Sequence, residues 1–317
     1  MKLSPRLALG FLIVSAAAFA EVPGVGVEWL QKISSAARTL NYSGTFVYQY
    51  GDQVEASRIW HYVEDSQQFE KLETMDGPVR EVIRTNDEVL CYYPDSKTVR
   101  IQKRRARAFP ALLPEQINGI TESYTVRLGD RERIAGYEAQ AVILEPRDGL
   151  RYGHKFWADV GSGLLLKART TNERKEMVEQ FAFTSLQIGG TFDKEALKPK
   201  RMPGWNLDAA GLAEPATGDT GWVVTSYPAG FRKIMESKRT IPGRPSPVSH
   251  IVYSDGLAAV SIFIEPLEAN KVPLNGVSHQ GAINVYTGLV ANNMVTVLGE
   301  APTETVVQIG KSIAARK

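Results

Sequence analysis

The feature that most constrains this fold is a succession of short strand-like runs separated by turn-forming residues. The runs are rich in β-branched and aromatic residues, which favour strands. Turn formers such as Gly51-Asp52, Asp76-Gly77-Pro78 and Pro94-Asp95 stand between them. The first group of predicted strands covers residues 45–50, 56–63, 69–74, 80–85, 89–93 and 98–103. This spacing predicts an antiparallel meander.

The rhythm breaks at residues 109–121, where prolines and a short predicted helix intervene. Strands then resume at Tyr124 and are predicted over 138–145, 152–159, 164–170 and 176–188. Ahead of all of them, apolar residues recur at helical spacing from Trp29 to Leu40. Ten or so strands with few helices predict a strongly curved sheet, whose concave side must be filled by helices or by a ligand.

The chain ends and composition suggest an exported protein of two domains. Lys2 and Arg6, an apolar run and the ending Ala18-Phe19-Ala20 are typical of a signal peptide over residues 1–20. Its removal takes two of the 37 basic residues and none of the 35 acidic ones. The remaining chain then has 35 of each, and a net charge near zero argues against general nucleic-acid binding.

We expect a large domain over residues 21–200, a linker rich in Gly, Pro and Ala over 201–221, and a small α+β domain over 222–317. In the last, strands are predicted near 223–227, 249–253, 258–265, 282–289 and 293–299, with a closing helix from about Thr303. The apolar run at 258–265 predicts a strand in the middle of its sheet.

Signatures of catalysis are missing from the sequence. It holds no Gly-x-Ser-x-Gly elbow, no phosphate-binding loop and no His-Glu-x-x-His pair. The four histidines stand singly, and the one cysteine, Cys91, lies in an apolar run where an inert, buried thiol is expected. We therefore expect no catalytic residues, no metal and no cofactor, although a Ser-His-Asp set assembled from distant segments stays open.

Two features could bind a ligand. The aromatic residues Phe46, Tyr48, Trp60 and Tyr62 could line an apolar cavity for acyl chains, with core packing as the favoured alternative. The basic run Lys103, Arg104, Arg105 and Arg107 could meet an anionic head group, with a solvated loop as the favoured alternative.

A collinear set of segments spans nearly all of the chain after residue 20. These segments are 41–48, 76–84, 145–148 with 151–153, 163–167, 227–231, 253–266, 281–286 and 295–300. In these segments the sequence resembles the MucB/RseB family, the periplasmic negative regulators of the envelope-stress sigma factor in Gram-negative bacteria.

The resemblance implies an N-terminal unclosed β-barrel, built like the lipoprotein carriers, with helices on its concave side. It implies that the α+β C-terminal domain binds the periplasmic domain of a RseA/MucA-like anti-sigma factor and blocks the initiating protease. A lipid or lipopolysaccharide signal would relieve the block. An alternative function is a periplasmic lipid or lipoprotein carrier, and a third is an envelope hydrolase; the oligomeric state, a homo-oligomer included, stays open.

As a hypothesis, the lipid-sensing side comprises the four aromatic residues and the basic run named above. The partner-binding side then comprises seven residues of the C-terminal domain: Trp222, Tyr227, Phe231, Asp255, Gly256, Phe263 and Glu265.

Overall fold

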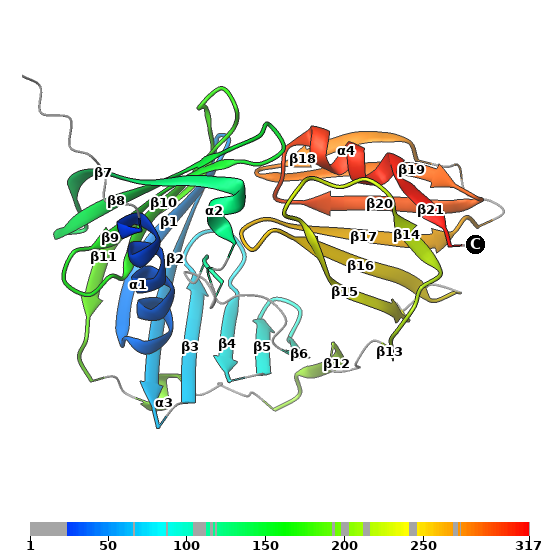
Figure 1. Cartoon of the computed structure of the whole chain (residues 1–317). Helices are drawn as coiled ribbons and strands as arrows, with labels where there is room; N and C mark the ends of the chain where they lie inside the picture. Colours follow the sequence, from blue (N-terminus) through cyan, green and yellow to red (C-terminus); the bar gives the residue numbers. More distant parts are fainter. Residues whose placement is uncertain are drawn as a thin grey trace, which may run out of the picture.

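A computed structural model describes most of the chain after residue 23. The described residues are 24–65, 67–86, 88–103, 112–114, 117, 119–191, 194–197, 203–211, 216–240, 246–268, 272 and 274–316. The predicted signal peptide and Arg104, Arg105 and Arg107 of the basic run lie outside them, and the side chain of Lys103 is not described. Two sheets stand side by side (Figure 1).

The larger sheet is a curved arrangement of twelve described strands. Its order is β12-β6-β5-β4-β3-β2-β1-β11-β10-β9-β8-β7, so β12 and β7 are edges that do not pair with each other. This confirms the predicted meander and the unclosed barrel. The strands are β1 Tyr42–Tyr50, β2 Gln53–Glu64, β3 Gln67–Thr74, β4 Glu81–Thr85, β5 Glu88–Tyr93, β6 Thr98–Lys103, β7 Tyr124–Ile134, β8 Tyr137–Pro146, β9 Gly153–Asp159, β10 Leu165–Thr171, β11 Met177–Ile188 and β12 Asn206–Gly211.

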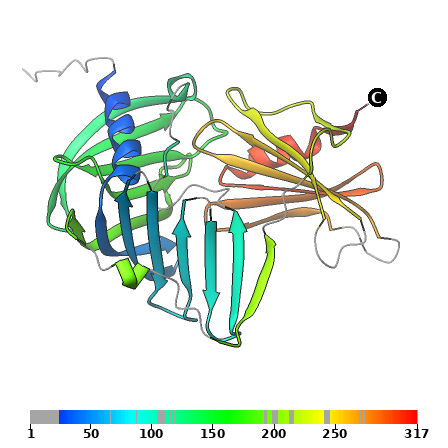
Figure 2. The same ribbon diagram turned by 90° about the horizontal axis from the view of Figure 1, so that it is seen from below.

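Helix α1 (Val25–Thr39) lies across the concave side of this sheet (Figures 1 and 2). Its apolar stripe, with Leu30, Ile33 and Ala36, packs on sheet residues that include Phe46 and Phe181. The predicted helix therefore fills the concave side as the curvature requires. Two single-turn helices, α2 (Ile120–Ser123) and α3 (Lys194–Leu197), complete this N-terminal domain.

The segment predicted as a linker contributes strands to both sheets. Residues of β12 pair in parallel with β6, and Trp205 just before it packs on Tyr92 with ring centroids 6.2 Å apart. Strand β13 (Ala216–Thr217) pairs with β15. Neither strand has an alternating apolar pattern. Each pairs with the unpaired backbone groups of an edge strand, and this pairing needs no particular sequence as long as proline is absent.

The C-terminal domain holds a seven-stranded sheet of order β13-β15-β16-β17-β20-β19-β18, with β17 in the middle as predicted. Its apolar core includes Ile251, Ile262 and Val297. The remaining elements are β14 Trp222–Val224, β15 Arg232–Arg239, β16 Val248–Ser254, β17 Ala259–Pro266, β18 Gly276–Gln280, β19 Ile283–Val290, β20 Asn293–Gly299, α4 Thr303–Lys311 and β21 Ile313–Ala315. Strands β14 and β21 form a separate pair.

Strands β15 and β18 were missed by the sequence prediction. Strand β15 reads RKIMESKR and every residue of β18 is exposed, so neither shows the apolar face by which strands are recognised. In the described part of the chain, no helix is long and apolar enough to cross a membrane.

Replacing Leu30 by alanine tests the role of α1 as the cover of the concave side. Leu30 is 0% exposed, so Leu30→Ala should lower the free energy of unfolding by about 2–5 kcal/mol through lost burial and the cavity left behind. Urea unfolding would measure it. The exposed neighbour Gln31 provides the control, since Gln31→Ala should change stability by less than about 0.5 kcal/mol.

Candidate functional site

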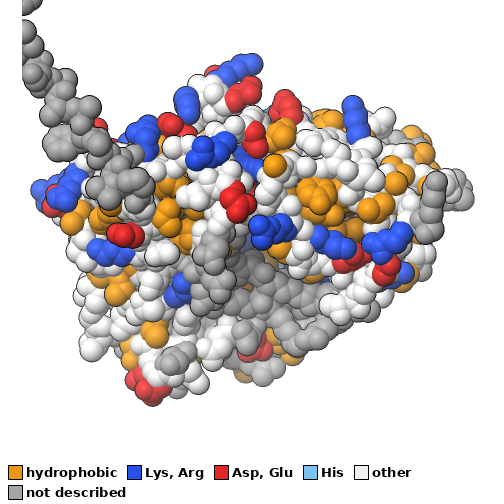
Figure 3. Space-filling view, viewed as in Figure 1, with side chains coloured by type: hydrophobic (Ala, Val, Ile, Leu, Met, Phe, Trp, Pro, Cys, Tyr) orange, Lys and Arg blue, Asp and Glu red, His pale blue; other side chains and the backbone are white. Residues whose placement is uncertain are grey.

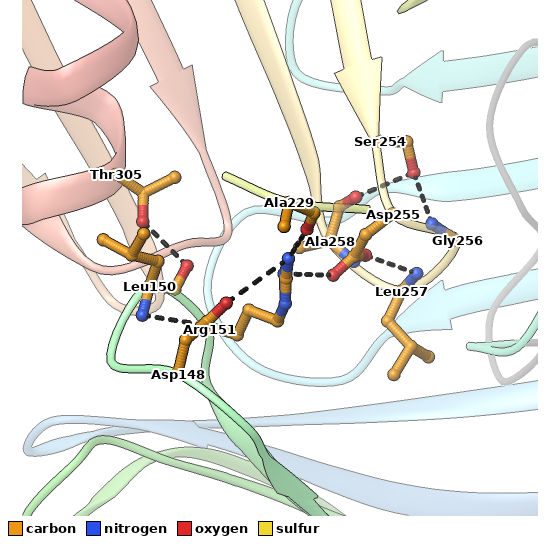
Figure 4. A network of polar contacts seen from close by, with 10 residues as sticks. All are labelled: Asp148, Leu150, Arg151, Ala229, Ser254, Asp255, Gly256, Leu257, Ala258 and Thr305. Atoms are coloured by element: carbon orange, nitrogen blue, oxygen red, sulfur yellow. Dashed lines mark hydrogen bonds and ion pairs between the residues drawn. The ribbon is translucent and has the colours of Figure 1, made fainter. Parts of the chain in front are cut away.

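The two domains meet through a buried ion pair between Arg151 and Asp255 (Figure 4). Arg151 follows β8 in the N-terminal domain, and Asp255 lies in the turn between β16 and β17 of the C-terminal domain. Their side chains are 1% and 0% exposed, with Nη1 of the arginine 3.4 Å from Oδ2 of the aspartate. We call Arg151, Asp255 and the residues bonded to them the domain junction.

Arg151 has further partners on both sides of the junction. Its Nη2 donates to the carbonyl oxygen of Ala229 and lies 3.6 Å from Oδ2 of Asp148. The guanidinium also stands over the ring of Phe231, 5.1 Å from the centroid. The arginine is therefore held by a carboxylate, a carbonyl and an aromatic face of the C-terminal domain at once.

The turn that presents Asp255 is shaped by its own side chains. Oδ1 of Asp255 accepts the N–H groups of Leu257 and Ala258, both at 2.9 Å, which leaves Oδ2 for Arg151. Gly256 has a φ of 101°, a left-handed conformation that a glycine adopts without strain. The sequence Ser-Asp-Gly thus positions the carboxylate through bonds within the turn itself.

The same turn reaches the mouth of the unclosed barrel. The side chain of Leu257 packs against the apolar core that α1 covers. Close by, Gly230 lies against Ser123 of α2, and any Cβ at this position would collide with the serine hydroxyl. The C-terminal domain therefore supplies part of the cover of the N-terminal core.

Hydrogen bonds to the two residues that flank Arg151, Leu150 and Tyr152, extend the domain junction. The Thr305 hydroxyl of α4 donates to the carbonyl of Leu150 at 2.7 Å, and Nδ2 of Asn284 donates to the Tyr152 hydroxyl at 2.8 Å. Beside them a cleft of about 300 Å³ takes lining residues from both domains, Arg174 and His279 among them. The contacts span enough of both domains to define one mutual orientation.

The electrostatics of the junction favour specificity over raw stability. Desolvating two charges offsets most of their attraction, so a buried ion pair adds little net stability while the loss of one partner is costly. The pKa of the nearby Tyr124 hydroxyl is raised, first by burial and then by the negative charge of Asp255. Neither Arg151 nor Asp255 can therefore stay buried as a charge without the other.

The predicted partner-binding residues fall into two groups. Phe231, Asp255 and Gly256 belong to the domain junction, where Phe231 and the Asp255 carboxylate are buried. Trp222 and Phe263 are half-buried in the C-terminal domain, Phe263 stacking on His250 at 4.2 Å. Half-buried Glu265 lines a groove, and Tyr227 is 43% exposed. The partner-binding role of all seven residues stays a prediction.

The predicted lipid-sensing aromatics do not form one wall. Trp60 is directly opposite Ser43, and Ser57 opposite Phe46, so Phe46 and Tyr48 face the concave core whereas Trp60 and Tyr62 face the outside of the sheet. The expectation of a single aromatic surface is therefore wrong. The prediction used only the alternation of aromatic residues within each strand. The register between β1 and β2 places the two aromatic pairs on opposite faces of the sheet.

Tyr48 has a polar contact on the concave side. Its hydroxyl donates to Glu179 of β11, and burial together with this carboxylate raises the pKa of Tyr48.

Cys91 is half-buried, and burial raises the pKa of its thiol although Arg80, Arg84 and Arg100 act in the opposite direction. Among the described residues, no three His, Cys, Asp or Glu side chains are grouped closely enough to hold a metal ion.

Arg151 and Asp148 were missed as functional residues. Both belong to a segment that carried the family resemblance, but nothing in the local pattern marks Arg151 as buried. Its partner Asp255 is 104 residues away, and such a pair leaves no periodic signal. A charged residue between a tight turn and an apolar strand was the available hint.

A double-mutant cycle tests the coupling of Arg151 to Asp255. Arg151→Leu leaves a buried carboxylate without its cation, and Asp255→Asn removes the charge while keeping the turn bonds. Each should lower the free energy of unfolding by about 2–4 kcal/mol, measured in urea. The double variant should lose at least about 1 kcal/mol less than the sum of the singles; strictly additive losses would contradict the coupling.

Acid should destabilise the protein through His154, because burial lowers the pKa of this residue to about 4. The unfolded chain takes up the proton near its ordinary pKa of about 6.5, so it binds more protons than the folded chain between these values. This contribution, about 3 kcal/mol in full, is complete well above pH 6.5 and falls as the pH drops towards 4. Urea unfolding between pH 4.5 and 7 should show a shallower slope for His154→Phe than for the wild type, and no change for the exposed His279→Gln.

Comparisons with known proteins match both domains to one family. The family models described as "MucB/RseB N-terminal domain" and "MucB/RseB C-terminal domain" match residues 26–201 and 216–314. The chain is 32% identical to the sigma factor AlgU regulatory protein MucB of Pseudomonas aeruginosa over 295 residues, covering 90% of each protein. It is 27% identical to the sigma-E factor regulatory protein RseB of Escherichia coli K12, covering 97% of this chain and 95% of that protein.

A solved structure, MucB in complex with MucA(peri), shares the fold with a TM-score of 0.74 and 29% identity, covering 92% of this chain and 99% of that one. A crystal structure of MucB gives a TM-score of 0.65 at 27% identity, with 92% of this chain and 98% of that one covered. Because the family models together span nearly all the described residues, this chain belongs to the MucB/RseB family.

Proposed function

We propose that this chain is a periplasmic negative regulator of an envelope-stress sigma factor. It would bind the periplasmic domain of a RseA/MucA-like anti-sigma factor and shield it from the initiating protease. The observation that carries the proposal is the likeness, across both domains, to MucB in its complex with MucA(peri). The chain would act by binding and not by catalysis, in keeping with the regulatory names of its relatives.

Exposed apolar side chains on the C-terminal domain offer a surface for such a partner. Tyr227 is 43% exposed and Ile234 is 63% exposed. The ring centroids of Tyr227 and Tyr253 are 4.8 Å apart. Ile234 lies at the irregularity in β15 between the residues that are opposite Tyr253 and Val252. In Figure 3, viewed as in Figure 1, hydrophobic side chains gather on the surface of the C-terminal domain. A rigid, amphipathic tyrosine in such a setting is the kind of residue that dominates binding energy.

Release of the partner by a lipid signal would follow from linkage. A ligand weakens a complex only to the extent that it binds the free form better than the bound form. Leu257 occupies the mouth of the barrel, so an apolar chain that enters there would compete with it and strain the domain junction. The predicted lipid or lipopolysaccharide signal could thus change the domain orientation that the partner recognises.

A binding measurement tests the function and the surface together. The full mature chain should bind the purified periplasmic domain of the anti-sigma factor from the same organism, and Tyr227→Ala should weaken the affinity at least tenfold. Met75→Ala, an exposed apolar residue of the N-terminal domain, is the control and should leave the affinity within about twofold. Isothermal titration calorimetry measures both.

A protection assay completes the test. The bound anti-sigma factor should resist cleavage by the initiating protease, and added lipopolysaccharide should restore cleavage. No binding by the wild-type chain would rule out the proposed function, whereas normal binding by Tyr227→Ala would move the surface elsewhere.

A further inference from the structure

The outer face of the N-terminal sheet carries three cations around one indole ring. Nζ of Lys155 and of Lys167 lie 4.4 and 4.6 Å from the ring centroid of Trp157, and Cζ of Arg169 lies 5.9 Å from it. Trp157 packs with Ala139, Ala141 and Leu166, apart from the core that α1 covers. We call the four residues Lys155, Trp157, Lys167 and Arg169 the tryptophan–cation cluster.

The strand register brings these charges together. Lys155 on β9 is directly opposite Arg169 on β10, and Trp157 is directly opposite Lys167. Like charges in directly opposite positions destabilise a sheet. The arrangement therefore opposes folding unless another group compensates it.

Compensation within the described part of the protein is incomplete. Glu132 accepts a hydrogen bond from Nζ of Lys155 at 3.1 Å. The Nε and Nη2 groups of Arg169 donate to Oε1 of Gln180 at 2.9 and 2.7 Å, but this amide is neutral. Among the described residues, Lys167 forms no ion pair.

The pKa of Lys167 reflects this excess of positive charge. The pKa of its ammonium group is lowered, first by burial and next by the positive charge of Arg169, with Lys155 adding to the effect and Glu132 opposing it. All three cationic residues are half-buried, so their repulsion is screened less than it would be in bulk water. An added anion would relieve it.

We propose that the tryptophan–cation cluster is a binding site for a phosphate group, either free or carried by a larger molecule. The three cations converge on one ring instead of forming a line, which suits a compact group of nearly two negative charges better than an extended acidic peptide. Lysines bind phosphate as point charges and the arginine adds directed N–H donors. The site is separate from the domain junction and does not depend on the proposed function.

Pyrophosphate serves as the probe, titrated by calorimetry into the full mature chain. Saturable binding is expected, weakening with added salt. Lys167→Gln should reduce the affinity at least tenfold. The matched control is Arg131→Gln on β7, which removes one positive charge that already has its own partner, Glu138 at 3.0 Å, and should change the affinity by less than twofold.

Thermal unfolding separates binding from a structural role. Because Lys167→Gln removes repulsion, its melting temperature should equal or exceed that of the wild type, and pyrophosphate should raise the melting temperature of the wild type more than that of the variant. The site assignment is overturned by any of four results: no saturable binding, equal affinity in the wild type and Lys167→Gln, equal losses in both variants, or a lower melting temperature for Lys167→Gln.

Vesicles identify the source of the phosphate once pyrophosphate binding is found. The wild type and Lys167→Gln are sedimented with phosphatidylcholine vesicles that contain or lack phosphatidic acid. Binding that needs phosphatidic acid and Lys167 assigns a lipid head group, and pyrophosphate binding without vesicle binding assigns a soluble phosphate compound. Both results support the site.

Discussion

The structure depends on one constraint, the apolar concave face of a sheet that does not close. Strands β7 and β12 stay apart, so neither the curvature nor the backbone pairing can shield the interior. Helix α1 covers the centre of this face, and the β16–β17 turn of the C-terminal domain contributes Leu257 near its mouth. Much of the two-domain architecture can be understood as a response to the exposed apolar surface that an open barrel leaves.

The buried ion pair at the mouth gives this cover its specificity. Apolar contacts such as that of Leu257 are non-directional and tolerate sliding, whereas Arg151 must meet Asp255, Ala229 and Phe231 together. A shift of the C-terminal domain by the width of one side chain would leave the guanidinium buried without its carboxylate. The pair therefore selects one orientation among many of similar apolar contact.

Much of the fold could be predicted from the sequence because its turns are chemically explicit. Gly51-Asp52 and Pro94-Asp95 separate strands β1 from β2 and β5 from β6. The failures concern information that no local pattern holds. Strand β18 has no buried face, the faces of Trp60 and Phe46 depend on pairing register, and Arg151 finds its partner 104 residues away. Edge pairing, register and long-range polar contacts belong to the tertiary structure.

The strands within the connecting segment have a consequence for how far the domains can separate. Strand β12 belongs to the first sheet and β13 to the second, so only four residues, 212–215, join them. Five peptide steps reach at most about 19 Å. If all contacts of the domain junction were broken, the domains could pivot without drifting apart, and the Asp255 turn would stay at a millimolar effective concentration near the barrel mouth. Any molecule that binds at the barrel mouth therefore competes with a turn that is tethered beside it. A ligand separates the domains only if its concentration and affinity together exceed this intramolecular competition.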